Sequence, residues 1–141
     1  MQVLLTIERV ALLRRVDLFA ATPDRVLAGL AQVLEEVDHP AGTQVMVEGA
    51  VEDWLYIVEH GELEVVRSDR RVAIGAGTVV GELAVLDPQP RSATVIALSP
   101  VRLLRLRMAA FDEALRSRPE IARGVIAELV RRLRETHQPM A

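Results

Sequence analysis

The residues best suited to chemistry gather in one stretch, Gly81–Thr94, which reads GELAVLDPQPRSAT. It opens with Gly81 and Glu82, and a short apolar run follows that can form the first turn of a small helix. Free N–H groups and the helix dipole at such a turn favour an anion. Arg91 adds a forked cation suited to a phosphate, and Glu82 adds an acceptor for sugar hydroxyls. The stretch therefore carries the groups needed to bind a phosphorylated ribose.

The composition narrows the classes of protein that can carry this site. The chain has 141 residues, of which 50% are hydrophobic and 3% aromatic, so we expect one domain with an aliphatic core. A net charge of -3 gives no general attraction to nucleic acid or to an anionic membrane. The absence of cysteine excludes disulfides and thiolate metal sites. Because the sequence has neither a signal-peptide pattern nor a membrane-length apolar run, we expect a cytoplasmic protein.

Other residue types that often do chemistry are poorly arranged for it. His39, His60 and His137 are too scattered along the chain for a metal site. Glu35-Glu36 and Glu52-Asp53 are adjacent pairs whose side chains diverge, so we expect them to be solvated or turn-forming rather than an acid–base dyad. No nucleophile–base arrangement is visible. We therefore predict no metal, no catalytic residue and no enzymatic activity.

Helices are predicted before the β-region, over about residues 3–34. Val3–Val16 has apolar residues at helical spacing, and Val16, Leu18 and Phe19 then form an apolar knot before a turn. Thr22-Pro23-Asp24 predicts the start of a second helix, with Thr22 as its N-cap, running to about Leu34.

Short β-branched runs separated by turn residues occupy about residues 35–107, where they predict a small antiparallel sandwich or barrel. The stretch Gly81–Thr94 precedes the last two of these runs, so the barrel must hold its two ends facing one another. The predicted strands are Gln44–Val47, Trp54–Val58, Leu63–Arg67, Val72–Ile74, Thr78–Val80, Ala93–Leu98 and Val101–Arg107.

Two helices are predicted at the end of the chain, over about residues 108–136. The first covers Met108–Arg116, and Pro119 starts the second, which runs to about Thr136. The second helix has an apolar stripe that we expect to pack against the barrel. Because the stripe is wider than one contact needs, a homodimer through this helix is also predicted. The stripe consists of Ile121, Val125, Ile126, Leu129, Val130 and Leu133.

This order of elements resembles the cyclic nucleotide-binding domain family, from about Leu12 to Leu133. The two fragments Gly81–Ala84 and Arg91–Thr94 stand where that family has its phosphate-binding cassette, here residues 81–94. Either fragment alone would mean little, but both at this spacing after a glycine-rich β-region are a strong signal. Further matching fragments are Pro40-Ala41-Gly42, Glu48-Gly49, Asp53, Leu55-Tyr56-Ile57-Val58 and Gly61. The resemblance implies a double-stranded β-helix jelly roll, mainly β with flanking helices, over a single domain 1–141.

The resemblance also implies roles for the residues of the cassette. Arg91 would pair with the cyclic phosphate, and Glu82 would bond the ribose 2′-hydroxyl. Further phosphate contacts would come from the backbone N–H groups near Leu83, Ala84 and Ala93 and from the Ser92 hydroxyl, and Gly81 would let the backbone approach closely. The ligand would be cyclic AMP or cyclic GMP, with no further cofactor.

The preference for adenine or guanine depends on residues whose role differs between members of the family. A hydroxyl after the arginine, here Ser92, favours guanine in eukaryotic kinase relatives, whereas bacterial activators with serine there bind cyclic AMP. Matching residues 131–136 to the last helix of those activators places Thr136 against adenine. We therefore expect cyclic AMP.

The resemblance implies a regulatory sensor whose C-terminal helix moves when the nucleotide binds and so signals to a partner domain or chain. One alternative is a truncated catabolite-activator-type transcription regulator. The chain stops at Ala141, before any helix-turn-helix, so we do not expect this chain to bind nucleic acid directly. Another alternative is an interaction module of this fold that no longer binds nucleotide. The opening helix is similar to those of terminal regulatory domains on larger bacterial proteins, including membrane-associated ones.

Overall fold

The computed structural model describes residues 5–137, which fall into two units. The β-unit covers Leu34–Ala110. The helical unit contains the described residues up to Val33 and those from Phe111 onward. Among residues 5–137, no helix combines the length and the apolar character that crossing a membrane requires.

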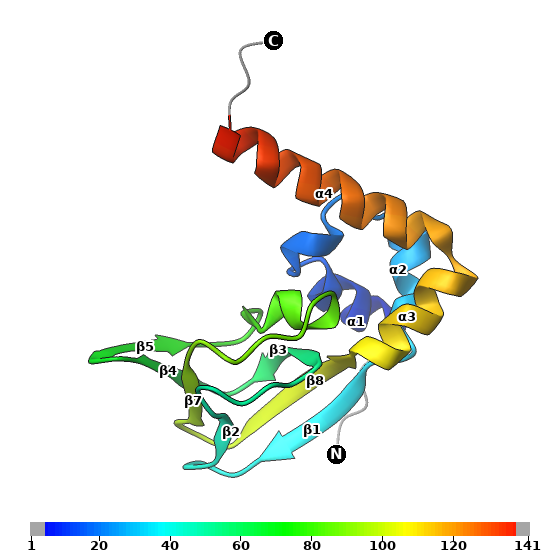
Figure 1. Ribbon diagram of the computed structural model, residues 1–141. Coiled ribbons are helices and arrows are strands. Elements are labelled where there is room, and N and C mark those ends of the chain that lie inside the picture. Colours follow the sequence, from blue (N-terminus) through cyan, green and yellow to red (C-terminus); the bar gives the residue numbers. More distant parts are fainter. Residues whose placement is uncertain (1–4, 138–141) are drawn as a thin grey trace. The chain divides into compact units, whose positions relative to one another are not determined.

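The β-unit is built from two four-stranded sheets in which every paired strand is antiparallel (Figure 1). One sheet has the order β1-β8-β3-β6 and the other β2-β7-β4-β5, so strands far apart in sequence become neighbours. This is a jelly-roll-like arrangement. The strands are β1 Glu35–His39, β2 Gln44–Met46, β3 Trp54–His60, β4 Leu63–Arg67, β5 Arg70–Ile74, β6 Val79–Val80, β7 Thr94–Ala97 and β8 Val101–Arg107. Seven of the eight correspond to the predicted runs.

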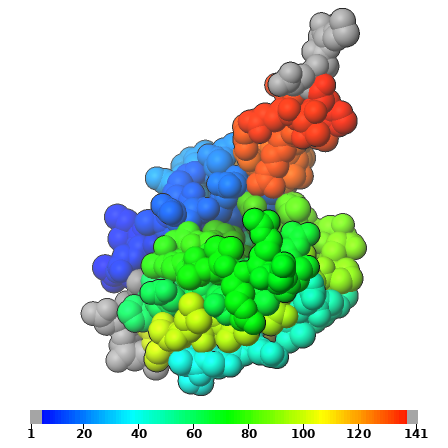
Figure 2. Space-filling model, turned by 90° about the vertical axis from the view of Figure 1, so that its left-hand side faces the viewer, coloured from blue at the N-terminus to red at the C-terminus, as the bar shows by residue number. Residues whose placement is uncertain are grey.

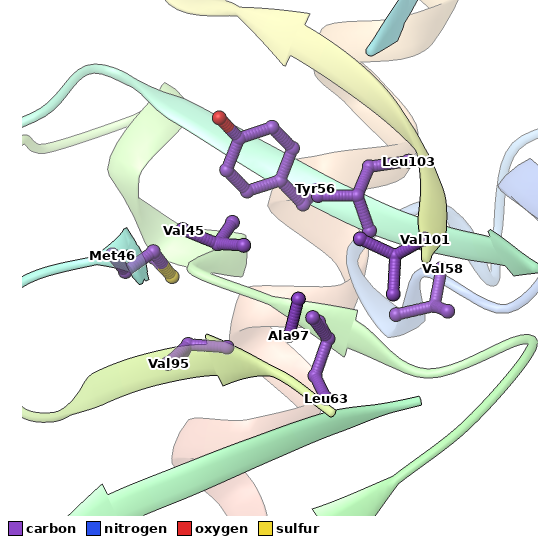
Figure 3. Close-up of a cluster of buried hydrophobic side chains, with 9 residues drawn as sticks. All are labelled: Val45, Met46, Tyr56, Val58, Leu63, Val95, Ala97, Val101 and Leu103. Carbon is purple, nitrogen blue, oxygen red and sulfur yellow. The ribbon is translucent and has the colours of Figure 1, made fainter. Parts of the chain in front are cut away.

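An aliphatic core lies between the two sheets, and Figure 3 shows its side chains pointing toward one another. Both sheets contribute, and Tyr56 is the one aromatic residue of the cluster. Burial of these side chains fastens the sheets to each other, because apolar area is removed from water on both inner faces. The cluster consists of Val45, Met46, Tyr56, Val58, Leu63, Val95, Ala97, Val101 and Leu103.

Strand β1 was not predicted. Glu35 is exposed, as expected, but it and the half-buried Glu36 lie in this strand rather than in a turn. β1 pairs with β8 along its whole length, with Glu35 opposite Arg105. The Glu35 carboxylate accepts hydrogen bonds from Arg107 at 2.7 Å and Arg105 at 3.3 Å. Partial burial raises the pKa of Glu35, but these bonds outweigh it and the net pKa is lowered. The acidic strand is thus matched to basic residues across the ladder.

The helical unit contains α1 Thr6–Leu13, the 3₁₀ turn η1 Asp17–Phe19, α2 Asp24–Ala31 and α4 Pro119–His137. Helix α3, Met108–Ser117, begins in the β-unit and continues into the helical unit. The predicted apolar knot is confirmed, since Val16, Leu18 and Phe19 are all fully buried. The ring centroids of Phe19 and Phe111 lie 5.9 Å apart, so this contact packs the N-terminal segment of the helical unit against its C-terminal segment.

The predicted N-cap of α2 is wrong. Pro23 is the N-cap residue, and no side chain caps the helix. Thr22 is instead 1% exposed, and its hydroxyl has no hydrogen-bond partner among the described residues. It faces Gly124 of α4, where an added Cβ would lie 2.5 Å from the Thr22 Oγ1 and 3.4 Å from the backbone carbon of Ala21. Gly124 therefore lets α4 approach the turn before α2.

The apolar residues of helix α4 are buried near its start and more exposed toward its end. Ile121 and Val125 are buried, whereas Ile126 and Leu133 are 60% and 57% exposed. In Figures 1 and 2 the last turns of α4 (red) extend beyond the N-terminal helices of the same unit (blue). The predicted apolar stripe thus exists, but it continues past the part that the helical unit covers.

Glu128 is an exception among the charged residues of α4, because it is 4% exposed. Arg131 donates to its carboxylate at 2.6 Å and 3.0 Å, and Arg132 donates at 3.2 Å. These donors keep the buried group ionised. The hydrogen bond from Arg131 has the largest effect on the pKa of Glu128 and lowers it, whereas burial raises it. With the further contribution of Arg132, the pKa of Glu128 falls from 4.5 to about 2.

The contact between Gly124 and Thr22 predicts that replacing this glycine by alanine destabilises the protein, although helix propensity alone predicts stabilisation. Gly124→Ala should lower the free energy of unfolding by about 1–3 kcal/mol, because the added methyl overpacks against Thr22. Elsewhere in a helix the same change stabilises by about 1 kcal/mol. As a control, Ala127→Gly at an exposed position of α4 should cost about 1 kcal/mol. Urea denaturation measures both, and a stabilised Gly124→Ala would contradict the packing described.

The charges around Glu128 predict an acid-dependent loss of stability. Since its folded pKa lies below its unfolded value, the stabilisation is complete above about pH 4.5 and is lost as the pH falls toward 2. Thermal melts from pH 7 to pH 2.5 should therefore show a shallower decline for Glu128→Gln than for the unaltered chain. Glu113→Gln, at an exposed site, is the control and should keep the original slope. Equal slopes for all three proteins would refute this role of Glu128.

Candidate functional site

The segment that leaves β6 turns sharply at Gly81. Gly81 has φ 74° and ψ 29°, the left-handed conformation that glycine adopts without steric cost. It is the N-cap of a short 3₁₀ helix, η2 Glu82–Val85, so the small helix predicted after Gly81 is present. The Leu83 N–H lies in the first turn, where no acceptor exists within the helix.

Arg91 is 8% exposed, which is unusual for an arginine. Its Nε donates to Oε1 of Glu52 at 3.2 Å, and its Nη2 donates to the Trp54 carbonyl at 2.6 Å. Its Nη1 has no hydrogen-bond partner among residues 5–137. The guanidinium is thus held at two of its three nitrogens.

The remaining nitrogen lies against Gly81. A Cβ at position 81 would lie 3.0 Å from Cζ of Arg91 and closer still to Nη1. It would also lie 3.1 Å from Cε of Met46. Position 81 therefore excludes a side chain for two reasons, its backbone conformation and the approach of the guanidinium. The structure brings together Gly81 and Arg91, which belong to the two fragments of the predicted cassette and are ten residues apart in sequence.

The backbone around Arg91 is fastened to the loop between β2 and β3. Arg91 N–H donates to the Ala50 carbonyl at 2.8 Å, and Gly49 N–H donates to the Arg91 carbonyl at 2.9 Å. Two further links are the Val51–Pro90 bridge and the bond from Glu48 N–H to the Thr94 hydroxyl at 3.0 Å. Arg91 is therefore positioned by hydrogen bonds on both sides of its Cα.

The other predicted cassette residues lie in varied surroundings. Glu82 is half-buried, whereas Leu83 is 51% exposed at the start of η2. Ala84 is buried, and its N–H donates to the Gly81 carbonyl at 3.0 Å. Ser92 is exposed and Ala93 half-buried, in a bend just before β7. The phosphate and ribose contacts assigned to these residues remain predictions.

Glu52 belongs to this site but was not predicted for it. Its side chain is 19% exposed, so the expectation of a solvated or turn-forming residue at Glu52-Asp53 misses its ion pair with Arg91. The two residues are 39 positions apart, and no local pattern links them. A buried arginine needs a counter-charge, but the sequence alone does not say which carboxylate supplies it.

Thr136, the predicted base contact, belongs to the helical unit. It lies in the last turn of α4, is exposed, and its hydroxyl donates to the Arg132 carbonyl at 2.9 Å. Its contact with a base remains a prediction. Within the described part of the chain, no group of three or more histidine, aspartate or glutamate side chains is arranged to hold a metal ion.

Chemically, this arrangement can bind an anion. It combines a buried cation, a glycine that allows close approach, and two N–H donors on Nη1 that no residue of the described chain accepts. The half-buried carboxylate of Glu82 lies in the residue next to Gly81.

Known proteins with similar sequences are named as cAMP-activated, cAMP-dependent or cyclic nucleotide-gated. The family model for the cyclic nucleotide-binding domain matches residues 36–118. A CRP-like cAMP-activated global transcriptional regulator of Mycobacterium tuberculosis is 32% identical over 92% of this chain and 61% of its own. A cAMP-dependent protein kinase regulatory subunit of Aspergillus fumigatus is 31% identical over 92% of this chain and 30% of its own. A cyclic nucleotide-gated potassium channel of Rhizobium etli is 34% identical over 81% of this chain and 32% of its own.

Solved structures agree on the fold. The N-terminal domain of a transcriptional regulator from Streptomyces coelicolor A3(2) is 36% identical, with a TM-score of 0.83 over 92% of this chain and 97% of that one. The catabolite activator protein of Thermus thermophilus is 26% identical, with a TM-score of 0.67 over 85% of this chain and 59% of that one. The predicted mainly β jelly roll with flanking helices is thus confirmed.

The chain spans between about a third and three fifths of the length of these curated relatives. The family model nevertheless covers more than half of this chain, and the solved domain from Streptomyces coelicolor covers 92% of it. The chain belongs to the cyclic nucleotide-binding domain family.

Proposed function

We propose that this chain is a regulatory sensor that binds cyclic AMP in preference to cyclic GMP, with Arg91 on the cyclic phosphate and Glu82 on the ribose. Gly81, Leu83, Ala84, Ser92 and Ala93 complete the phosphate contacts. The supporting observation is the Nη1 of Arg91, which lies against Gly81 and has no hydrogen-bond acceptor among residues 5–137. A singly charged phosphate there would gain charge-assisted hydrogen bonds in a poorly solvated site.

The preference for cyclic AMP is supported by two relatives whose names specify it, the regulator and the kinase subunit. Thr136 is the residue we propose for the contact with adenine. The nucleotide would act by favouring one position of α4, through which the signal passes to a partner domain or chain. The larger parent proteins of the relatives suggest such partners, one of them a membrane channel. The cytoplasmic location expected from the sequence stays a prediction.

The exposed apolar residues of α4 support a homodimer. Ile126, Val130 and Leu133 lie at spacings of four and three residues, so they share one face of the helix. They are 60%, 37% and 57% exposed. A second copy of the chain would bury this face on its own equivalent.

Calorimetric titration tests the ligand. Cyclic AMP should bind more tightly than cyclic GMP, and 5′-AMP, which lacks the cyclic phosphate, should bind more weakly than both. Arg91→Ala should weaken cyclic AMP binding by about 1.5–3 kcal/mol, roughly 10- to 150-fold, because a charge-assisted contact is lost.

Arg91 also has structural partners, so the folded state of each variant must be confirmed by circular dichroism. Arg91→Lys, which keeps the charge but not the fork, should bind with intermediate affinity. Arg70→Ala, which removes an exposed arginine of the same unit, is the control and should bind normally. No heat with either cyclic nucleotide, using folded protein, would reject the proposed function.

Sedimentation equilibrium tests the dimer. Leu133→Glu should shift the chain to a monomer, because a charge would be buried in the apolar contact. Leu98→Glu, at a leucine that is 47% exposed in the β-unit, should leave the mass unchanged. A monomeric unaltered chain, or a dimer that tolerates Leu133→Glu, would contradict a dimer through α4.

A further inference from the structure

Glu52 holds Arg91 in a way that decides which of its donors remain available. The carboxylate accepts from Nε, and the Trp54 carbonyl accepts from Nη2. With Nε and Nη2 held by these hydrogen bonds, the guanidinium presents Nη1 to Gly81. The loop that carries Glu52 is itself fastened to the backbone of Arg91 through Ala50 and Gly49.

Glu52 also alters the charge that an anion meets. The Arg91 side chain is 6% exposed and that of Glu52 is 19% exposed, so water screens their interaction only partly. The pair is neutral as a unit. A phosphate arriving at Nη1 is attracted by the guanidinium and repelled by the carboxylate on the opposite edge of the same group. Glu52 therefore favours the correct orientation of Arg91 and opposes tight binding of an anion.

We propose that Glu52 is a positioning residue that orients Arg91 and, by its charge, sets a moderate affinity for the phosphate of the ligand. This inference rests on the proposed function, since it concerns the affinity of the same site. It separates two properties of one side chain, the acceptor oxygen that orients and the charge that weakens binding. Glu52→Gln removes the charge alone, and Glu52→Ala removes the charge and the acceptor together.

Calorimetry with cyclic AMP at several salt concentrations tests the proposal. Glu52→Gln keeps an acceptor for Nε and removes the charge, so cyclic AMP should bind about three- to tenfold more tightly. The affinity of this variant should also fall more steeply with salt, because its site carries a net positive charge. Glu52→Ala removes the acceptor as well, so it should bind less tightly than Glu52→Gln.

The matched control is Glu62→Gln, which makes the same change in net charge at an exposed residue of the β-unit. It should bind as the unaltered chain does. Combining Glu52→Gln with Arg91→Lys should remove most of the gain, because the effect depends on the guanidinium. A second readout needs no nucleotide: the Nε–H proton signal of Arg91 should shift strongly in Glu52→Ala and much less in Glu52→Gln.

The outcomes separate the two proposals. If the unaltered chain binds no cyclic nucleotide, the proposed function fails and this inference fails with it. If the chain binds, but Glu52→Gln binds no more tightly or Glu62→Gln gains equally, the inference alone is overturned. An Arg91 Nε–H signal that is unchanged in Glu52→Ala would likewise overturn the positioning role.

Discussion

The ion pair between Arg91 and Glu52 is the constraint on which the rest of the site depends. Burying Arg91, which is 8% exposed, destabilises the folded state unless a counter-charge and hydrogen-bond acceptors compensate for the lost water. The β-unit supplies a carboxylate and a carbonyl from one loop and strand, and it leaves one nitrogen facing a glycine. The cation is therefore stable where it lies and still able to attract an anion.

That arrangement requires the jelly roll around it. Glu52 lies in the loop before β3, Trp54 begins β3, Gly81 follows β6, and Arg91 precedes β7. Strands β3 and β6 are neighbours in one sheet, whereas β7 belongs to the other, so the site joins the two sheets. The aliphatic core, to which β3 and β7 both contribute side chains, holds the two sheets together (Figure 3).

Local patterns predicted much of this structure. The turn residues and β-branched runs located seven strands, and Gly81 with Arg91 located the candidate site. β1 was missed because its one apolar residue, Val37, gives no strand pattern, and its acidic side chains are matched by arginines about 65–70 residues away. The errors at Glu52 and Thr22 have the same origin, since their surroundings come from Arg91 and Gly124, far along the chain.

The claim that Arg91 and Gly81 form the ligand site is tested most directly by nuclear magnetic resonance. Cyclic AMP would be titrated into the labelled chain while the backbone amides and the arginine Nε–H groups are observed. We expect the largest shifts at Gly81, at Leu83 and at the side chain of Arg91. Saturable binding that leaves these signals unmoved, or no binding at millimolar nucleotide, would contradict the assignment of the ligand site to Arg91 and Gly81.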